Sequence, residues 1–140
     1  MMVSTRGRYA LQVLIDLAEH NSGEFIPMKN VAERQELSPK YLERILQVLA
    51  KNKLVVGAHG KGGGYRLNRT PDEYTVGEVL RLTEGDLAPV SCIKDGEKCA
   101  AGECRTMKMW HDFYKLTNDY FNHITIADLM DMEQPDNYVI

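Results

Sequence analysis

The segment from Met28 to Lys51 constrains the fold most strongly, because its pattern predicts two short helices joined by a tight turn. Gln35-Glu36-Leu37 forms the turn. Ser38-Pro39 then starts the second helix, since serine caps free amides and proline suits the first helical position. This order is typical of a helix-turn-helix, although an ordinary helical hairpin has the same pattern. The expected buried positions are Val31, Ala32, Leu42, Ile45, Leu46 and Leu49.

Two short apolar runs with a glycine-rich segment between them follow this pair of helices. Residues 54–56 and 65–67 predict the strands of a β-hairpin, or wing. Four glycines within Gly60–Gly64 allow close approach to a minor-groove wall, with His59 and Lys61 beside them. A phosphate-binding enzyme loop is the weaker alternative, because the terminal Gly-Lys-Ser/Thr of a P-loop is absent.

The remaining periodicity predicts a mainly α fold with a small β-wing, a winged helix-turn-helix followed by a long C-terminal dimerisation helix. A first helix is expected over residues 4–19, and Thr75 opens a short helix with a capping-box pattern. Residues 84–103 have no period and predict a loop. A long amphipathic helix starts near Arg105, and Thr125 caps a last short one. We expect a DNA-binding domain at 1–84, a cysteine loop at 85–104, and a dimerisation helix with a tail at 105–140.

Charge is distributed unevenly along the 140-residue chain, whose net charge is −3. Residues 1–70 hold 11 Lys and Arg against 6 Asp and Glu, whereas residues 71–140 hold 6 against 14. A basic first half suits a protein that approaches phosphate with one end. No apolar run approaches the ~20 residues that span a bilayer, and no signal peptide is apparent. We therefore expect a cytoplasmic protein without catalytic motifs, and so not an enzyme.

The helix from Ser38 has the chemistry of a major-groove recognition helix, because its N-terminus attracts phosphate and its first turns reach base edges. Lys40 and Arg44 suit phosphate or guanine, and Tyr41 suits phosphate. Glu43 repels phosphate and accepts hydrogen bonds only from cytosine, so we expect it to discriminate between sites. The expected DNA-binding residues are Ser38, Pro39, Lys40, Tyr41, Glu43, Arg44, His59, Gly60 and Lys61.

All three cysteines, Cys92, Cys99 and Cys104, lie within 13 residues. Clustered thiolates bind soft metals or iron–sulfur clusters. Zinc is a poorer match, because structural zinc sites use Cys-x2-4-Cys pairs and four protein ligands. Three incidental thiols are the remaining alternative. An iron–sulfur cluster needs a fourth ligand, and Met107, His111 and a residue of a partner subunit are the candidates.

Several motifs together resemble the IscR/NsrR/CymR-type family of winged-helix transcription regulators, and IscR, the iron–sulfur cluster regulator, in particular. They are residues 4–10 (STRGRYA), 37–43 (LSPKYLE), 62–65 (GGGY), 76–79 (VGEV) and the three cysteines. The resemblance covers about residues 1–132. It implies a bacterial homodimer that binds promoter operators in double-stranded DNA and controls iron–sulfur cluster biogenesis genes, as a repressor or activator. It also implies a [2Fe–2S] cluster on Cys92, Cys99 and Cys104, and makes Glu43 the residue that restricts the cluster-free form to one class of site.

The chain departs from this resemblance at three places. The cysteines are spaced x6 and x4 instead of x5 and x5, and Met107 stands where the resemblance implies a histidine ligand. His59 replaces a wing arginine and is mostly uncharged at pH 7, so Lys61 is expected to supply charge there. A nitric-oxide sensor of the NsrR type is an alternative function. A cysteine-metabolism regulator or partner-binding module of the CymR type is another, although such proteins typically lack the cysteine trio.

Overall fold

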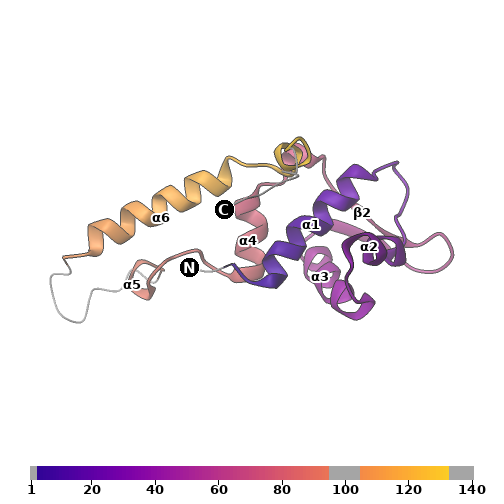
Figure 1. The fold of residues 1–140 in the computed structure, drawn as a ribbon, viewed down its shortest axis with the longest axis horizontal. Helices are drawn as coiled ribbons and strands as arrows, with labels where there is room; N and C mark the ends of the chain where they lie inside the picture. Colours follow the sequence, from indigo (N-terminus) through magenta and orange to yellow (C-terminus); the bar gives the residue numbers. More distant parts are fainter. Residues whose placement is uncertain (1–2, 95–104, 133–140) are drawn as a thin grey trace, which may run out of the picture.

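The computed structural model describes residues 3–94 and 105–132, which form a mainly helical fold with a small antiparallel hairpin toward one end of its long axis (Figure 1). Two of the predicted cysteine ligands, Cys99 and Cys104, lie outside the described residues. The elements in chain order are α1 (Thr5–Glu19), α2 (Met28–Gln35), α3 (Pro39–Lys51), β1 (Val55–Ala58), β2 (Gly64–Leu67), the 3-10 helix η1 (Pro71–Glu73), α4 (Val76–Glu84), α5 (Ser91–Lys94), α6 (Met107–Asn122) and α7 (Ile126–Met130).

The main hydrophobic core lies where α1, α2 and α3 meet the hairpin, as the apolar spacing predicted. One face of α1 contributes Val13, Leu14 and Leu17, each at most 1% exposed. These side chains pack against the buried face of α3. Ile126 of α7 also joins this cluster and is fully buried. The C-terminal end of the described chain therefore folds back onto the N-terminal helices.

The turn between α2 and α3 is made by a non-glycine residue in the left-handed region. Glu36 has φ 54° and ψ 42° and ends α2, while the Leu37 N–H donates to the Ala32 carbonyl at 3.0 Å. The Ser38 hydroxyl then accepts from the Tyr41 N–H at 3.2 Å, and Pro39 occupies the first helical position. The predicted helix-turn-helix and its serine cap are confirmed.

The wing is a two-stranded hairpin extended by one bridge to the segment before α2. Val55 pairs with Leu67 and Ala58 with Gly64. On the other side of β2, Ile26 and Tyr65 exchange backbone hydrogen bonds of 2.8 and 2.9 Å. Gly64 has φ +146°, and a Cβ there would collide with the Ile26 carbonyl oxygen. A glycine is therefore required where the wing joins the helix-turn-helix.

A polar joint connects the wing to α4. Tyr74 is fully buried; its hydroxyl accepts from the backbone N–H groups of Asn68 and Arg69 at 3.0 Å and donates to the Leu54 carbonyl. Arg69 forms a bidentate pair with Glu78 at 2.8 and 3.0 Å. This pair corrects the capping-box prediction in part: Thr75 caps α4, but the Glu78 side chain turns toward Arg69 and not back to the cap.

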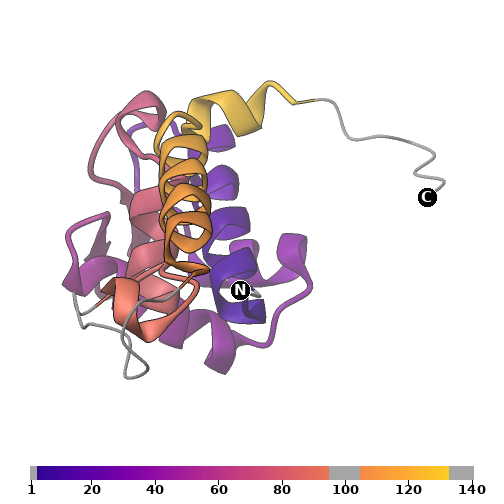
Figure 2. The ribbon, with the colours of Figure 1, turned by 90° about the vertical axis from the view of Figure 1, so that its left-hand side faces the viewer.

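Helix α6 lies at the opposite end of the long axis from α2 and the hairpin (Figure 1). It contacts α4, and Figure 2 shows it crossing in front of that helix. Arg81 of α4 donates to Asn118 at 3.2 Å and to Asn122. Thr125 caps α7 in a capping box, as expected. The described residues include no helix that is both long and apolar enough to cross a bilayer.

The predicted loop at residues 84–103 is wrong in one place. Ser91–Lys94 forms the short helix α5, and its Ile93 is 9% exposed. Four residues are too few to show a helical period, so the pattern alone did not reveal this helix. Before α5, Leu87 packs with Val76 and Leu80 of α4 in a second, smaller core. The domain boundaries proposed from sequence stay predictions.

Candidate nucleic-acid interface

Helix α3 has one buried and one polar face. Leu42, Ile45, Leu46 and Leu49 are at most 1% exposed. The opposite face carries the exposed side chains of Lys40, Glu43, Arg44 and Gln47. Because its inward face is fixed by packing, these four side chains have a defined direction toward solvent. Such a face suits contact with DNA groups in the major groove.

Tyr41, a predicted DNA-binding residue on the same helix, is only half exposed. Its ring packs edge-on against Tyr9 of α1, with ring centroids 6.0 Å apart and an interplanar angle of 87°. Aromatic pairs in this arrangement hold each other in place. Tyr41 therefore connects α3 to α1. No local sequence pattern around Tyr41 predicts its contact with Tyr9.

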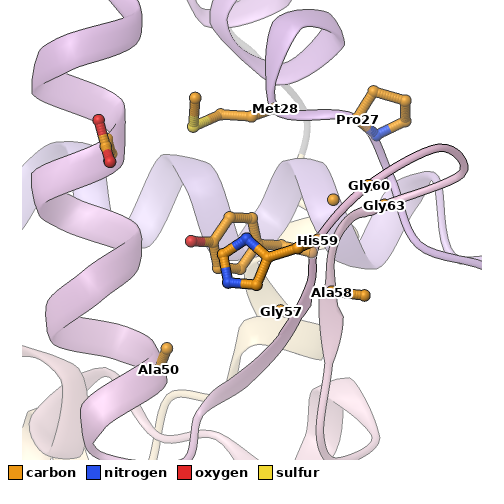
Figure 3. Close-up of a pocket in the computed structure, with 11 residues that line it drawn as sticks. Pro27, Met28, Ala50, Gly57, Ala58, His59, Gly60 and Gly63 are labelled. Atoms are coloured by element: carbon orange, nitrogen blue, oxygen red, sulfur yellow. The ribbon is translucent and has the colours of Figure 1, made fainter.

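A groove of about 540 Å³ separates α3 from the wing (Figure 3). Glu43 lines it from α3, and His59 and Gly60 line it from the wing. Tyr65 contributes from β2, and Met28 from the start of α2. Lys61 is exposed at the wing turn but does not line this groove. The structure thus brings together Glu43 and His59, two residues that the sequence placed in separate elements.

Several basic residues of the positively charged first half form contacts with other residues of the chain. Arg66 donates to the Gly23 carbonyl at 2.9 Å and lies 4.5 Å from the Phe25 ring centroid. Arg69 is paired with Glu78, which raises the pKa of Arg69 through hydrogen bonding. Arg34 is similarly engaged. Among the predicted DNA-binding residues, the positive charges are Lys40, Arg44 and Lys61, and all three are exposed.

Asp16 anchors the helix-turn-helix to α1. Its carboxylate accepts from the Arg34 guanidinium at 2.9 and 2.7 Å and from the Gln35 amide at 2.9 Å. Burial acts to raise the pKa of Asp16, but these hydrogen bonds and the positive charges of Arg34 and His20 together hold it below its usual value. This cluster was not predicted from the sequence. An acidic residue on the apolar face of α1 was the available signal, because a buried carboxylate needs partners.

The predicted cluster ligands are described only in part. Cys92 is free and half-buried in α5. Met107 begins α6 and is half-buried, and His111 lies one turn further and is exposed. Near this segment the Tyr114 hydroxyl donates to Asp86 at 3.0 Å. Within residues 3–94 and 105–132, no three His, Cys, Asp or Glu side chains converge as a metal site.

The outer face of α6 exposes large apolar side chains. Met109 is 52% exposed, Leu116 69% and Tyr120 65%. With Phe113 and Phe121, Leu116 and Tyr120 line a shallow groove of about 380 Å³. Phe121 also packs against the small core beside α4. A contiguous apolar surface of this kind is typical of a protein–protein contact.

A protein-family model described as "Rrf2: Iron-dependent Transcriptional regulator" matches residues 3–132. Among curated relatives, the HTH-type transcriptional regulator IscR of Erwinia tasmaniensis is 34% identical over 135 residues, covering 96% of this chain and 81% of the relative. The IscR of Sodalis glossinidius is 33% identical, with the same coverage of 96% and 81%.

Solved structures with similar folds include two regulators with different names. T. potens IscR has a TM-score of 0.75 at 33% identity, covering 96% of this chain and 94% of that one. CymR (YrzC), the global cysteine regulator of B. subtilis, has a TM-score of 0.79 at 30% identity, covering 93% and 96%. The mainly helical fold with a two-stranded wing is therefore shared with both.

Proposed function

The chain belongs to the Rrf2 family of transcription regulators, and from this premise we propose that α3 and the wing bind operator sites in double-stranded DNA. One observation carries the proposal. Glu43 of the exposed α3 face lines the same groove as His59 and Gly60 of the wing, so a DNA strand in that groove would contact both elements. Nothing in this arrangement requires a catalytic group, and the family members named above are regulators, not enzymes.

Each interface residue has a proposed role that follows from its chemistry. The N-terminus of α3, with Ser38, Pro39 and Lys40, would bind a phosphate. Arg44 would contact guanine or phosphate, and Glu43 would disfavour sites that offer it no donor. Tyr41, whose ring packs against Tyr9, would donate its hydroxyl to the DNA backbone. The wing residues His59, Gly60 and Lys61 would face the minor groove.

The input of the regulator is proposed to be a [2Fe–2S] cluster held by Cys92, Cys99 and Cys104. The donor set fits in chemical type, because three thiolates are soft ligands for iron–sulfur clusters, and Cys92 is a half-buried free thiol. Met107, His111 or a residue of the partner subunit would complete the set. When bound, the cluster would supply sensitivity to cellular iron–sulfur status. The proposed targets are iron–sulfur cluster biogenesis genes, which the protein would repress or activate in the cytoplasm.

We further propose that two copies pair through α6. The support is the exposed apolar face formed by Phe113, Leu116 and Tyr120. In a dimer the two recognition helices would bind half-sites about 34 Å apart, one turn of DNA. Leu116→Glu should give a monomer in sedimentation experiments, whereas Lys115→Glu on the neighbouring exposed position serves as the control. An unchanged dimer in Leu116→Glu would contradict this role of α6.

The principal test is selection from random-sequence duplex DNA with anaerobically purified protein. We expect one enriched operator class, a coloured protein, and loss of colour in Cys92→Ala, Cys99→Ala and Cys104→Ala. Met107→Ala and His111→Ala compared by absorption spectra would identify the fourth ligand. Enrichment of no sequence would contradict the regulatory function, while a colourless protein that still selects an operator would contradict only the cluster.

The similarity to CymR supports a second candidate, a regulator of cysteine metabolism. This function would use the same α3 and wing without a cluster. A colourless protein after anaerobic reconstitution, with operator binding that survives alanine at all three cysteines, would favour it. Loss of operator selectivity in the same variants would favour the cluster-dependent regulator.

A further inference from the structure

The contact between α4 and α6 is built around one arginine. The Arg81 guanidinium of α4 donates to the side-chain oxygen of Asn118 at 3.2 Å, and to that of Asn122 one turn later on α6. The Asn118 amide nitrogen in turn donates to the Tyr114 carbonyl at 2.9 Å, which leaves its oxygen to accept from Arg81. Because a guanidinium is a rigid planar fork, binding both asparagines at once restricts how α6 can turn against α4.

A glycine one turn before Arg81 makes room for this contact. Gly77 belongs to the 76–79 motif and is buried within α4. A Cβ at this position would collide with the Asn122 side-chain oxygen and would lie 3.0 Å from an Arg81 guanidinium nitrogen. The backbone of Gly77 is helical, a conformation that any residue other than proline adopts easily. Glycine is therefore needed here for the close approach of α6 and not for the path of the chain.

Helix α6 is fixed at its C-terminal end and extends away from that end. The Val76 N–H donates to the Ile124 carbonyl at 2.8 Å, and the Ile126 N–H donates to the Tyr74 carbonyl at 3.0 Å. Figure 1 shows the rest of α6 leading away from this junction along the long axis. Its 16 residues span about 24 Å. A change of about 10° in its direction would therefore move its far end by about 4 Å, slightly more than one base-pair step.

We propose that the polar contact between α4 and α6 is a positioning cluster that sets the half-site spacing recognised by a dimer. Its members are Gly77, Arg81, Asn118 and Asn122. The proposal rests on the proposed function, because it requires DNA binding by α3 and pairing through α6. Helix α4 is itself fixed to the DNA-binding part of the chain, since Val79 lies in the main core and the Ser4 hydroxyl donates to Glu84. The direction of α6 against α4 therefore decides where α3 lies relative to the paired helices.

The test measures affinity by fluorescence anisotropy for duplexes that carry two copies of the selected half-site, with the spacing between them varied one base pair at a time. Each added base pair rotates one half-site by about 35°, and the DNA must deform to compensate. Wild-type protein should prefer one spacing over its neighbours by about tenfold. Arg81→Gln and Gly77→Ala should reduce this preference to about threefold or less. Both variants should keep wild-type affinity for a duplex with a single half-site.

Gly77→Ala separates a positioning role from a purely structural one. Alanine favours a helix more than glycine does, so this variant should unfold no more easily in urea, while its methyl group displaces the Asn122 side chain from Arg81. Lys115→Gln is the matched control, because Lys115 is an exposed residue of α6 outside the cluster. It should keep the wild-type spacing preference.

Three results would overturn different parts of this reasoning. An unchanged spacing preference in both Arg81→Gln and Gly77→Ala, or a monomer of either variant in sedimentation experiments, would overturn the inference alone. Wild-type protein that binds its half-sites equally well at every spacing would overturn pairing through α6 and the inference with it. Selection of no operator by wild-type protein would overturn the proposed function itself.

Discussion

Asp16→Asn should lower the free energy of unfolding by about 2 to 3 kcal/mol. The Asp16 side chain is 2% exposed and accepts three hydrogen bonds, two of them from Arg34. Hydrogen bonds to a charged group contribute ~1.5–3 kcal/mol each. Adding the three hydrogen bonds overstates the loss of stability, however, because the Arg34 side chain is 32% exposed and is rehydrated when the pair breaks. Breaking a pair with both partners buried costs ~3–5 kcal/mol, so a smaller value is expected here.

Urea unfolding followed by circular dichroism at one fixed protein concentration measures this difference, because an associating protein has concentration-dependent stability. Asp112→Asn is the matched control. Its carboxylate is 59% exposed and pairs with a Lys108 side chain that is 88% exposed, and such surface pairs contribute less than ~1 kcal/mol. If the two variants lose the same stability, the anchoring role assigned to Asp16 is refuted.

The Asp16–Arg34 pair also predicts how the free energy of unfolding changes with pH. Folding holds the pKa of Asp16 below its usual value, despite the opposing effect of burial, since Arg34 and Gln35 bond to the carboxylate. The stabilisation is therefore fully present above the unfolded-state pKa of about 3.9 and is lost as pH falls through the lower, folded-state value. Wild type and Asp16→Asn should therefore approach equal unfolding free energies in acid. If the difference between them widens as the pH falls, the predicted direction of the pH dependence is wrong.

Three further predictions concern local structure, each measured by denaturant unfolding. Glu36→Gly should stabilise the protein by about 1 kcal/mol, because Glu36 has φ 54° and glycine adopts this conformation without strain; a loss of stability would contradict it. Gly64→Ala should destabilise the protein by more than about 1 kcal/mol, because of both its φ of +146° and a clash with the Ile26 carbonyl. Gly23 also has a positive φ but open space around it, so Gly23→Ala measures the cost of the backbone conformation without a clash. Tyr74→Phe should cost about 2 to 4 kcal/mol, because it leaves a buried carbonyl and two backbone N–H groups without the hydroxyl; a near-neutral result would show that these groups find other partners.

The helix-turn-helix and wing followed from sequence because their signals are local. Ser38-Pro39 marks a helix start within two residues, and the glycines between the apolar runs mark a hairpin. The core face of α3 followed from the same periodicity, since burial of Leu42, Ile45, Leu46 and Leu49 needs only a 3.6-residue repeat.

Contacts between distant residues did not follow, because no local pattern encodes the partner. Asp16 meets Arg34 across 18 positions, and Tyr74 bonds to Leu54 across 20. The capping-box pattern at Thr75 was misleading for the same reason: Glu78 has a stronger partner in Arg69, nine residues earlier. The aromatic residues of α6 recur with a helical period, yet their surroundings differ. Phe121 packs near α4, whereas Phe113 is 41% exposed.

Helix α4 connects α1 to α6 through polar contacts at its C-terminal end. Ser4, which caps α1, donates to Glu84, and Arg6 donates to the Thr83 carbonyl. Arg81, about one turn before Glu84, donates to two asparagines of α6. If α6 pairs two copies as proposed, these contacts fix how far each recognition helix lies from the dimer axis. The segment leading to Cys92 leaves from the same end of α4, beside the contacts that hold α1, and α1 in turn contacts α3 through the Tyr9–Tyr41 pair.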